Sequence, residues 1–140
     1  MTFDVVVETI QEALLAAALT PTLDPKTQID LDNETFDQSL VPAGLPWLRL
    51  TVTETVCVQL TTGSPRIWES KGRVTAQCFA PAGQGSQVAN KLAVSVRKTF
   101  EGKLLATDLE LKESTVTPVG NDNRWWQVNV STAYVSRDIH

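Results

Sequence analysis

The clearest cluster of potential metal ligands in this chain is acidic and consists of Asp30, Asp32, Glu34 and Asp37. Oxygen ligands at alternate positions are typical of a calcium-binding loop, which also needs a glycine at its sixth position and a bidentate glutamate at its twelfth. With Asp30 at the first position, these two places are taken by Thr35 and Val41. The pattern therefore predicts a solvated acidic loop and no metal site.

Side chains that could act as nucleophiles or transfer protons are few. The single histidine, His140, is the last residue of the sequence, and chain ends are usually poorly ordered. The two cysteines, Cys57 and Cys78, match neither a zinc-binding nor a redox spacing. No Ser–His or Cys–His pair can be placed in a rigid core. We therefore predict that the protein has no catalytic residues and is not an enzyme.

A glycine-rich segment, Gly83-Gln84-Gly85, resembles the start of a dinucleotide-binding fingerprint. The third glycine of that fingerprint is replaced by Val88, and no parallel β-α-β unit surrounds the segment. The segment therefore predicts a tight turn that leads into a helix, and we expect no bound cofactor.

Length and composition indicate one globular domain over residues 1–140. Hydrophobic residues make up 42% of the chain and charged residues 20%, which suffices for one core. The formal net charge is −4 and no basic run exists, which argues against sequence-specific binding to nucleic acid. The apolar run at residues 13–19 is too short to cross a bilayer, so we expect a soluble intracellular protein with no membrane partner.

Hydrophobic periodicity predicts the elements of this domain. Apolar residues recur at helical spacing in two segments and alternate with polar residues in several others. We expect helices over residues 4–19 and 86–101, and strands over residues 28–32, 47–60, 66–80, 115–119 and 125–134. The predicted fold class is α+β: a mainly antiparallel sheet of about five strands with two helices packed on one face.

The two longest strands are predicted to form a hairpin whose tip, near Gly63, stands clear of the core as an arm. The apolar residues from Leu48 to Leu60 all have even numbers, so an uninterrupted strand would place them on one face. We expect Gly72 to mark a bulge or a bend. This register places Cys57 opposite about residue 70 and Cys78 opposite about residue 49, too far apart for a disulfide. We therefore predict two free thiols.

Aromatic and arginine side chains provide the candidate binding surface. Trp126 falls on the apolar face of its strand, whereas Trp47 and Trp125 fall on the opposite face and Trp68 lies in the arm. Exposed aromatic residues beside arginines are typical of protein interfaces. The candidate interface residues are Trp47, Arg49, Arg66, Trp68, Arg73, Arg124 and Trp125. The alternative is that the two faces of the sheet are simply covered by other parts of the chain.

Six short motifs, in this order and spacing, give the chain a family resemblance over about residues 5–135. They are Asp-Asn-Glu-Thr-Phe at residues 32–36, Leu-Pro-Trp-Leu-Arg-Leu at 45–50, Lys-Gly-Arg-Val-Thr-Ala-Gln at 71–77, Phe-Ala-Pro-Ala-Gly-Gln-Gly at 79–85, Thr-Phe-Glu-Gly at 99–102 and Arg-Trp-Trp-Gln-Val-Asn-Val at 124–130. In this arrangement the chain resembles the tail terminator (tail completion) proteins of long-tailed, lambda-like phages and prophages.

The resemblance implies an antiparallel sheet with two helices, and a homo-hexameric ring that caps the finished tail tube. Such a ring would stop tail polymerisation and present a surface to the head–tail connector protein. The implied partners are further copies of the chain, the tail tube protein and the connector, while DNA passes through the bore without specific binding. The implied location is the host cytoplasm during assembly and then the virion tail. The family has no catalytic residues to carry over to this chain.

Two other classes of function stay open at this point. A different phage neck or tail tube component would share the fold but would form open polymers or a ring of another size. A non-phage binding module or a small enzyme would need a concave pocket with convergent polar groups. A pocket lined by Asp30, Asp32, Arg49 and Arg73 would support the enzyme.

Overall fold

The structure is a computed structural model, and it describes residues 1–140 except residues 33, 35, 84, 85 and 123. The described part is an α+β fold with one mixed sheet, in the strand order β1-β2-β3-β6-β5-β4. The elements are α1 (Phe3–Leu15), β1 (Ile29–Asp30), the 3-10 helix η1 (Gln38–Leu40), β2 (Trp47–Gln59), β3 (Ile67–Pro81), α2 (Gln87–Phe100), β4 (Leu104–Ala106), β5 (Leu109–Asn121) and β6 (Trp125–Ile139). The expected sheet of about five strands is thus six-stranded over the described residues, and β1 runs parallel to β2.

Both helices bury an apolar stripe in the same core. In α1 the buried residues Val6, Ile10 and Leu14 recur every fourth position, which is the spacing of one helical face. In α2 the buried residues are Ala89, Leu92, Ala93, Val96 and Phe100. These side chains form one cluster with alternate residues of β2, β3 and β6, and we call the side of the sheet that they cover the helix face. No helix among the described residues is both long and apolar enough to span a membrane.

Helix α1 is shorter than its sequence predicts, because it ends at Leu15 and not at residue 19. The residues that follow are good helix formers, but Leu19 and Leu23 are both buried in the main core. The backbone N–H of Thr20 also donates to the hydroxyl of Ser95 on α2, at 3.2 Å. Tertiary contacts therefore end the helix earlier than helix propensity alone predicts.

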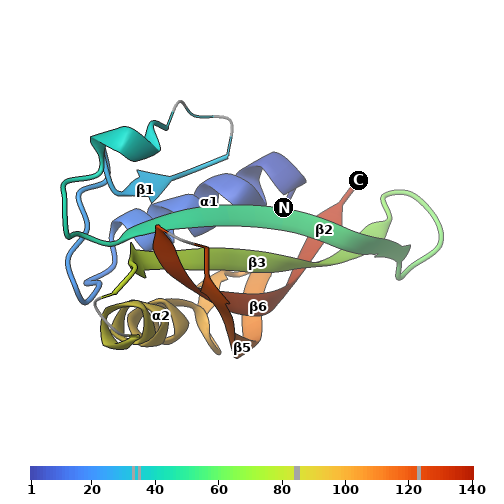
Figure 1. The fold of residues 1–140 in the computed structure, drawn as a ribbon. Coiled ribbons are helices and arrows are strands. Elements are labelled where there is room, and N and C mark those ends of the chain that lie inside the picture. Colours follow the sequence, from blue (N-terminus) through green and yellow to red (C-terminus); the bar gives the residue numbers. More distant parts are fainter. Residues whose placement is uncertain (33, 35, 84–85, 123) are drawn as a thin grey trace.

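The long hairpin has nearly the register that the sequence predicts. Cys57 lies opposite Ser70, and Cys78 lies opposite Leu48, one residue from the expected position. The prediction of two free thiols is confirmed: Cys57 is exposed and Cys78 is buried. In Figure 1, β2 and β3 extend beyond both helices to the loop that joins them. We call residues 53–71 the arm.

A β-bulge at the base of the arm changes which face its side chains occupy. Glu54 pairs with Gly72, but the next pair is Val56 with Lys71, so Thr55 is an extra residue in β2. Directly opposed residues share a face of the sheet, so Val56 lies on the same face as Lys71. The expectation that all even-numbered apolar residues of β2 share one face is therefore wrong beyond Glu54. The bulge lies in β2, opposite Gly72, and not in β3.

The second hairpin is longer than predicted. β5 covers thirteen residues, and not only residues 115–119, and it also pairs with the short β4, which the sequence did not predict. Two register shifts in the β5–β6 pairing, between Leu111 and Ser114 and between Pro118 and Gly120, break the alternation of β5. This is why its period of two is not visible in the sequence.

A small second core lies on the face of the sheet opposite both helices, which we call the open face. Trp47 and Phe79 are buried there with Val41, and Phe36 and Trp125 pack against them. Phe36 and Val41 belong to the segment between β1 and β2, so this loop covers one end of the open face. The middle of the open face, between this loop and the arm, carries mainly polar side chains.

Candidate functional site

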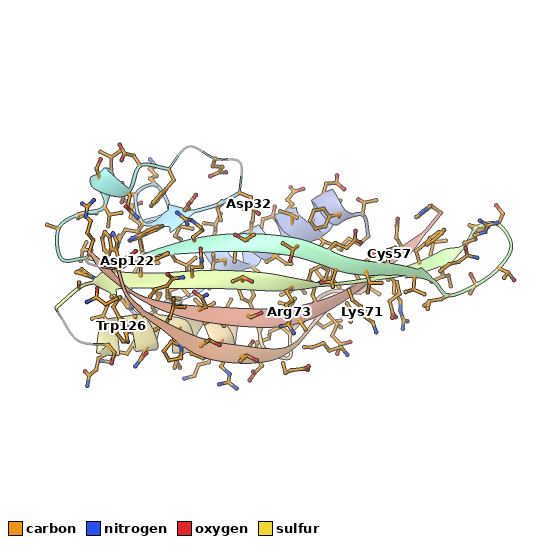
Figure 2. All side chains as sticks on the ribbon, turned by 45° about the vertical axis from the view of Figure 1, so that its right-hand side comes forward. Asp32, Cys57, Lys71, Arg73, Asp122 and Trp126 are labelled. Carbon is orange, nitrogen blue, oxygen red and sulfur yellow. The ribbon has the colours of Figure 1, made fainter. Side chains whose placement is uncertain are left out.

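The seven candidate interface residues fall into three separate regions. Trp47, Arg49, Arg124 and Trp125 lie at the covered end of the sheet, Arg73 lies near the middle of the open face, and Arg66 and Trp68 lie on the arm. Figure 2 shows Arg73 on the sheet, Lys71 and Cys57 toward the arm, and Asp122 at the other end. The candidates therefore do not form one continuous patch.

Trp47 does not have the exposed position that the sequence suggested. It lies on the expected face but is 0% exposed, because Phe36 and Phe79 stack on its ring with centroid distances of 5.0 and 4.1 Å. Trp125 is half-buried and meets the same ring edge-on at 6.0 Å. At this end of the sheet, the alternative that the faces are covered by other parts of the chain is correct. The local pattern of one strand contains no signal for the loop that covers it.

Arg49 closes this aromatic cluster on its solvent side. Its guanidinium carbon lies 5.3 Å from the centroid of the Trp47 ring and 5.9 Å from that of Phe79. Its Nε donates to Oδ2 of Asp30 at 2.8 Å, and the arginine side chain stays 44% exposed. A planar cation held over aromatic rings and paired with one carboxylate is a rigid surface feature. The Arg49–Asp30 pair joins β1 to β2, and one side of the guanidinium stays accessible to a partner.

Arg73 is exposed on the middle of the open face. Its Nη1 donates to the hydroxyl of Ser131 on β6, at 3.0 Å. Thr53 and Ala133 lie directly opposite it on the neighbouring strands, and Thr75 and Lys71 flank it on β3, so most of its neighbours on this face are small and uncharged. Such a surface can accept and donate hydrogen bonds at little desolvation cost, as polar interface rims do.

The far end of the arm is tied to the end of β6. Arg66 and His140 exchange two backbone hydrogen bonds, of 3.0 and 2.9 Å. The imidazole of His140 stacks on Trp68 with a centroid distance of 5.4 Å. His140, expected at a poorly ordered chain end, thus belongs to a three-stranded part of the arm. Trp68 is half-buried by this contact, and Arg66 is exposed.

Sequence reasoning missed an exposed apolar strip on the arm. It consists of Val56, Val58, Leu60 and Ile139, which are 44–64% exposed. The bulge at Thr55 moves the first three from the helix face to the open face, and Ile139 pairs there with Ile67. The only sequence signal is that the apolar alternation of β2 continues beyond the length that the helices can cover.

The residues considered for chemistry have structural partners. Asp30 is paired with Arg49, and Oδ2 of Asp32 accepts the backbone N–H of Val52 at 3.4 Å. Burial raises the pKa of the Cys78 thiol to about 12, so the reactive thiolate is absent near neutral pH. Among the residues that the structure describes, no group of three or more His, Cys, Asp or Glu side chains is placed to hold a metal ion. Asn33 and Thr35 of the acidic segment, and Gln84 and Gly85 of the glycine turn, lie outside the described residues.

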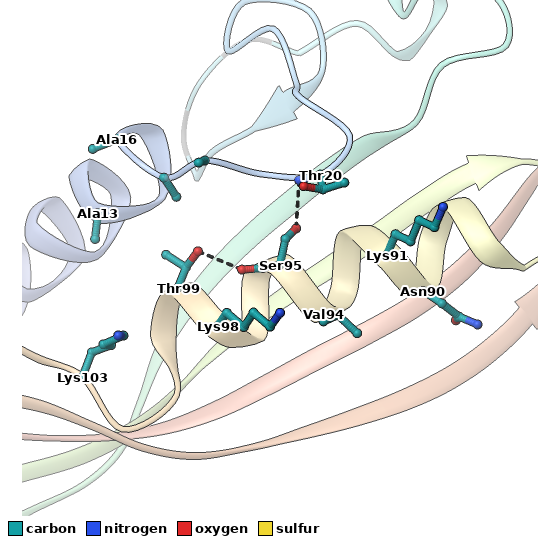
Figure 3. A pocket seen from close by; sticks show the side chains of 12 residues that line it. Ala13, Ala16, Thr20, Asn90, Lys91, Val94, Ser95, Lys98, Thr99 and Lys103 are labelled. Carbon is teal, nitrogen blue, oxygen red and sulfur yellow. Dashed lines mark hydrogen bonds between the residues drawn. The ribbon is translucent and has the colours of Figure 1, made fainter.

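A groove of about 840 Å³ lies between the end of α1 and the exposed side of α2. Its floor is made of small side chains, and three lysines line it (Figure 3). None of Asp30, Asp32, Arg49 and Arg73, the residues named for an enzyme pocket, lines this groove. Among them, Arg49 and Asp30 neutralise each other. The groove and the exposed arm are therefore the surfaces best suited to binding another macromolecule.

Comparison with known proteins agrees with a role in assembly. The family model described as phage tail terminator protein matches residues 9–134. One solved structure superposes with a TM-score of 0.61 over 95% of this chain and 94% of that chain, at 18% identity, which shows a shared fold alone. No curated protein sequence matches the chain. Because the family model covers nearly the whole chain, the protein belongs to the phage tail terminator family, a family of structural proteins of the phage tail.

Proposed function

We propose that this protein caps the phage tail tube as a homo-hexameric ring, ends tail polymerisation and joins the tail to the head–tail connector protein. The observation that carries the proposal is the family match over residues 9–134. On this proposal the chain assembles in the host cytoplasm and remains in the virion tail. Its partners are further copies of itself, the tail tube protein and the connector.

The arm supports this proposal as a means of contact between copies. Its apolar strip is exposed, and contiguous exposed apolar side chains are typical of interaction sites. Among the described strands, only β1 lies outside β2, and it pairs only with Leu48 and Arg49. The outer edge of β2 along the arm is therefore available for pairing with a neighbouring chain. A contact between an arm and a different surface of the next copy is heterologous, and such contacts form a ring when the rotation from copy to copy closes.

The charge of the chain fits a passage for DNA. The formal net charge is −4, and a ring multiplies it by the number of subunits. A bore lined by acidic or uncharged side chains repels phosphates and lets DNA move through without specific binding.

The proposal is tested by native mass spectrometry over a wide concentration range, with negative-stain images of the same samples. A species of six times 15.3 kDa with a central hole is the expected result. Purified chain added to polymerising tail tubes should then fix their length and appear at one end. Open filaments would favour a different tube component and contradict the terminator proposal.

A variant of the arm tests whether the apolar strip takes part in assembly. Val56→Ser combined with Val58→Ser removes exposed apolar surface, and neither side chain is part of a buried core. The variant should melt close to wild type and lose ring formation and tube capping together. If it forms rings and caps tubes as wild type does, the apolar strip has no part in the assembly.

A further inference from the structure

The groove between α1 and α2 has an apolar floor and a basic rim. The floor is formed by Ala13, Ala16, Ala17 and Ala18 of α1 and the segment after it, and by Val94 of α2, which is 47% exposed. Lys91 and Lys98 of α2 and Lys103 beyond it line the groove, and no acidic residue does. Figure 3 shows these lysines along the exposed side of α2 and just after it. Small side chains on the floor leave room for another element to approach closely.

The three lysines are not neutralised within the described chain. The ion pairs of the described residues involve Lys71 and Lys112 but none of the groove lysines. The net charge of the chain is negative, so three unpaired cations around an apolar groove indicate an acidic and amphipathic occupant.

The outer side of α1 has the complementary composition. Asp4, Glu8 and Glu12 recur every fourth residue, so they form one acidic row away from the buried stripe. None of them takes part in the ion pairs of the described residues. Beside this row Val5 and Leu15 are 38% and 43% exposed. Like charges at this spacing destabilise a helix slightly, so the row weakens the isolated chain.

We infer that the acidic outer side of α1 in one copy docks into the lysine-lined groove of the next copy. This inference rests on the proposed ring and names one of its contacts. The dimensions agree: Asp4 to Glu12 spans roughly 12 Å along a helix, and Lys91 to Lys98 spans roughly 10 Å. Val5 and Leu15 would cover Val94 and the alanine floor, as in other helix-in-groove contacts. The contact joins two different surfaces, so it runs head to tail around the ring.

Charge reversal on each side separately tests the inference. Lys91→Glu with Lys98→Glu places acidic residues on both sides of every contact, and Glu8→Lys with Glu12→Lys places basic residues on both sides. Each double variant should raise the concentration at which half of the chains are in rings by about tenfold or more, as measured by native mass spectrometry. Lys26→Glu with Lys112→Glu makes the same change in net charge away from the groove and should leave ring formation unchanged.

An equimolar mixture of the groove variant (Lys91→Glu with Lys98→Glu) and the α1 variant (Glu8→Lys with Glu12→Lys) provides the decisive measurement. In the mixture an acidic groove meets a basic α1, and a basic groove meets an acidic α1, so rings with alternating copies should form again. Isotope labelling of one variant allows its copies in each ring to be counted, and an equal share of both variants is expected. Circular dichroism on each variant confirms that the fold is retained.

The other outcomes separate this inference from the proposed function. If both double variants form rings as wild type does, the inference is wrong and the ring proposal stands. If neither double variant forms rings and the mixture does not restore them, the proposed pairing of the groove with α1 is wrong. A two-fold dimer in the mixture would contradict the head-to-tail arrangement. A wild-type chain that stays monomeric, both alone and on tail tubes, would overturn the inference and the ring proposal together.

Discussion

The ring of Tyr134 lies directly against Gly72, its partner across β3 and β6, and occupies the space where a side chain at position 72 would be. A Cβ atom added to Gly72 would lie 2.6 Å from Cε1 of Tyr134 and 2.0 Å from the backbone oxygen of Thr53. Glycine is therefore required here by close packing opposite the bulge. The pair of Gly72 and Tyr134 fixes the point at which the core ends and the arm begins.

Gly72→Ala is expected to destabilise the fold by about 2–3 kcal/mol, because the added Cβ atom would overlap both the Thr53 carbonyl and the tyrosine ring. Urea denaturation of the purified chain measures this change. Gly63→Ala, in the arm loop, is the control: it has a positive φ of 93° but nothing within 4 Å of the added atom. It should cost about 1 kcal/mol. Equal losses in the two variants would disprove the packing role of Gly72.

Trp47→Ala and Trp68→Ala should have opposite effects on folding and assembly. Trp47 is fully buried in the second core, so its loss is expected to cost about 3–5 kcal/mol. The Trp68→Ala substitution removes mainly the stack on His140, so the chain should stay folded while ring formation is impaired. Thermal melting and native mass spectrometry on both variants distinguish these effects. Equal drops in melting temperature would remove Trp68 from the candidate interface.

Deletion of Thr55 should separate arm orientation from core stability. Without the extra residue, Val56 follows Glu54 directly and still lies opposite Lys71 on the open face, so the apolar strip keeps its face. Only the bend and the extra twist of the bulge, which set the direction of the arm, are lost. The chain is expected to fold and to lose assembly. Deletion of Thr62 shortens the loop of the arm without removing the bulge, and it should preserve assembly. Normal rings from the Thr55 deletion would show that the bulge does not orient the arm.

The two cysteines should differ sharply in reactivity. Cys57 is exposed, whereas Cys78 is buried and its pKa is raised to about 12 by desolvation. We expect one thiol per folded chain to react with Ellman's reagent and the second to react only after unfolding. The Cys57→Ser variant should show no reaction in the folded state. A fast second thiol in the folded wild type would contradict the burial of Cys78.

Glu101 should contribute to stability only above the acid range. The backbone N–H of Ser114 donates to its carboxylate, Arg97 also pairs with it, and both contacts lower its pKa below the ordinary value of 4.5. The folded state therefore favours the carboxylate, and this stabilisation is complete above pH 4.5 and is lost as the pH falls through the lowered pKa. Melting temperatures between about pH 6 and pH 3 should fall less steeply for Glu101→Gln than for wild type. Glu113→Gln, on the exposed part of β5, should follow the wild-type curve.

The sequence predicts those parts of the fold whose signals are local. The stripe of α2 from Ala89 to Phe100 and the alternation of Val74, Ala76 and Cys78 in β3 both have the expected burial. The buried position of Trp47 could not be predicted, because it depends on a loop that lies across the open face. The bulge at Thr55 could not be predicted either, since the apolar alternation of β2 continues through it.

Thr55, the extra residue of the bulge, also divides β2 into two segments in which substitutions have different consequences. Before Thr55, the even-numbered apolar side chains of β2 are buried and stabilise the fold. Beyond Thr55, they are exposed on the arm and affect only its contacts with other molecules. Substitutions in the arm can therefore change partner choice without a loss of fold. A graft of the arm from a relative would keep its orientation only if the donor segment began before the bulge and included it.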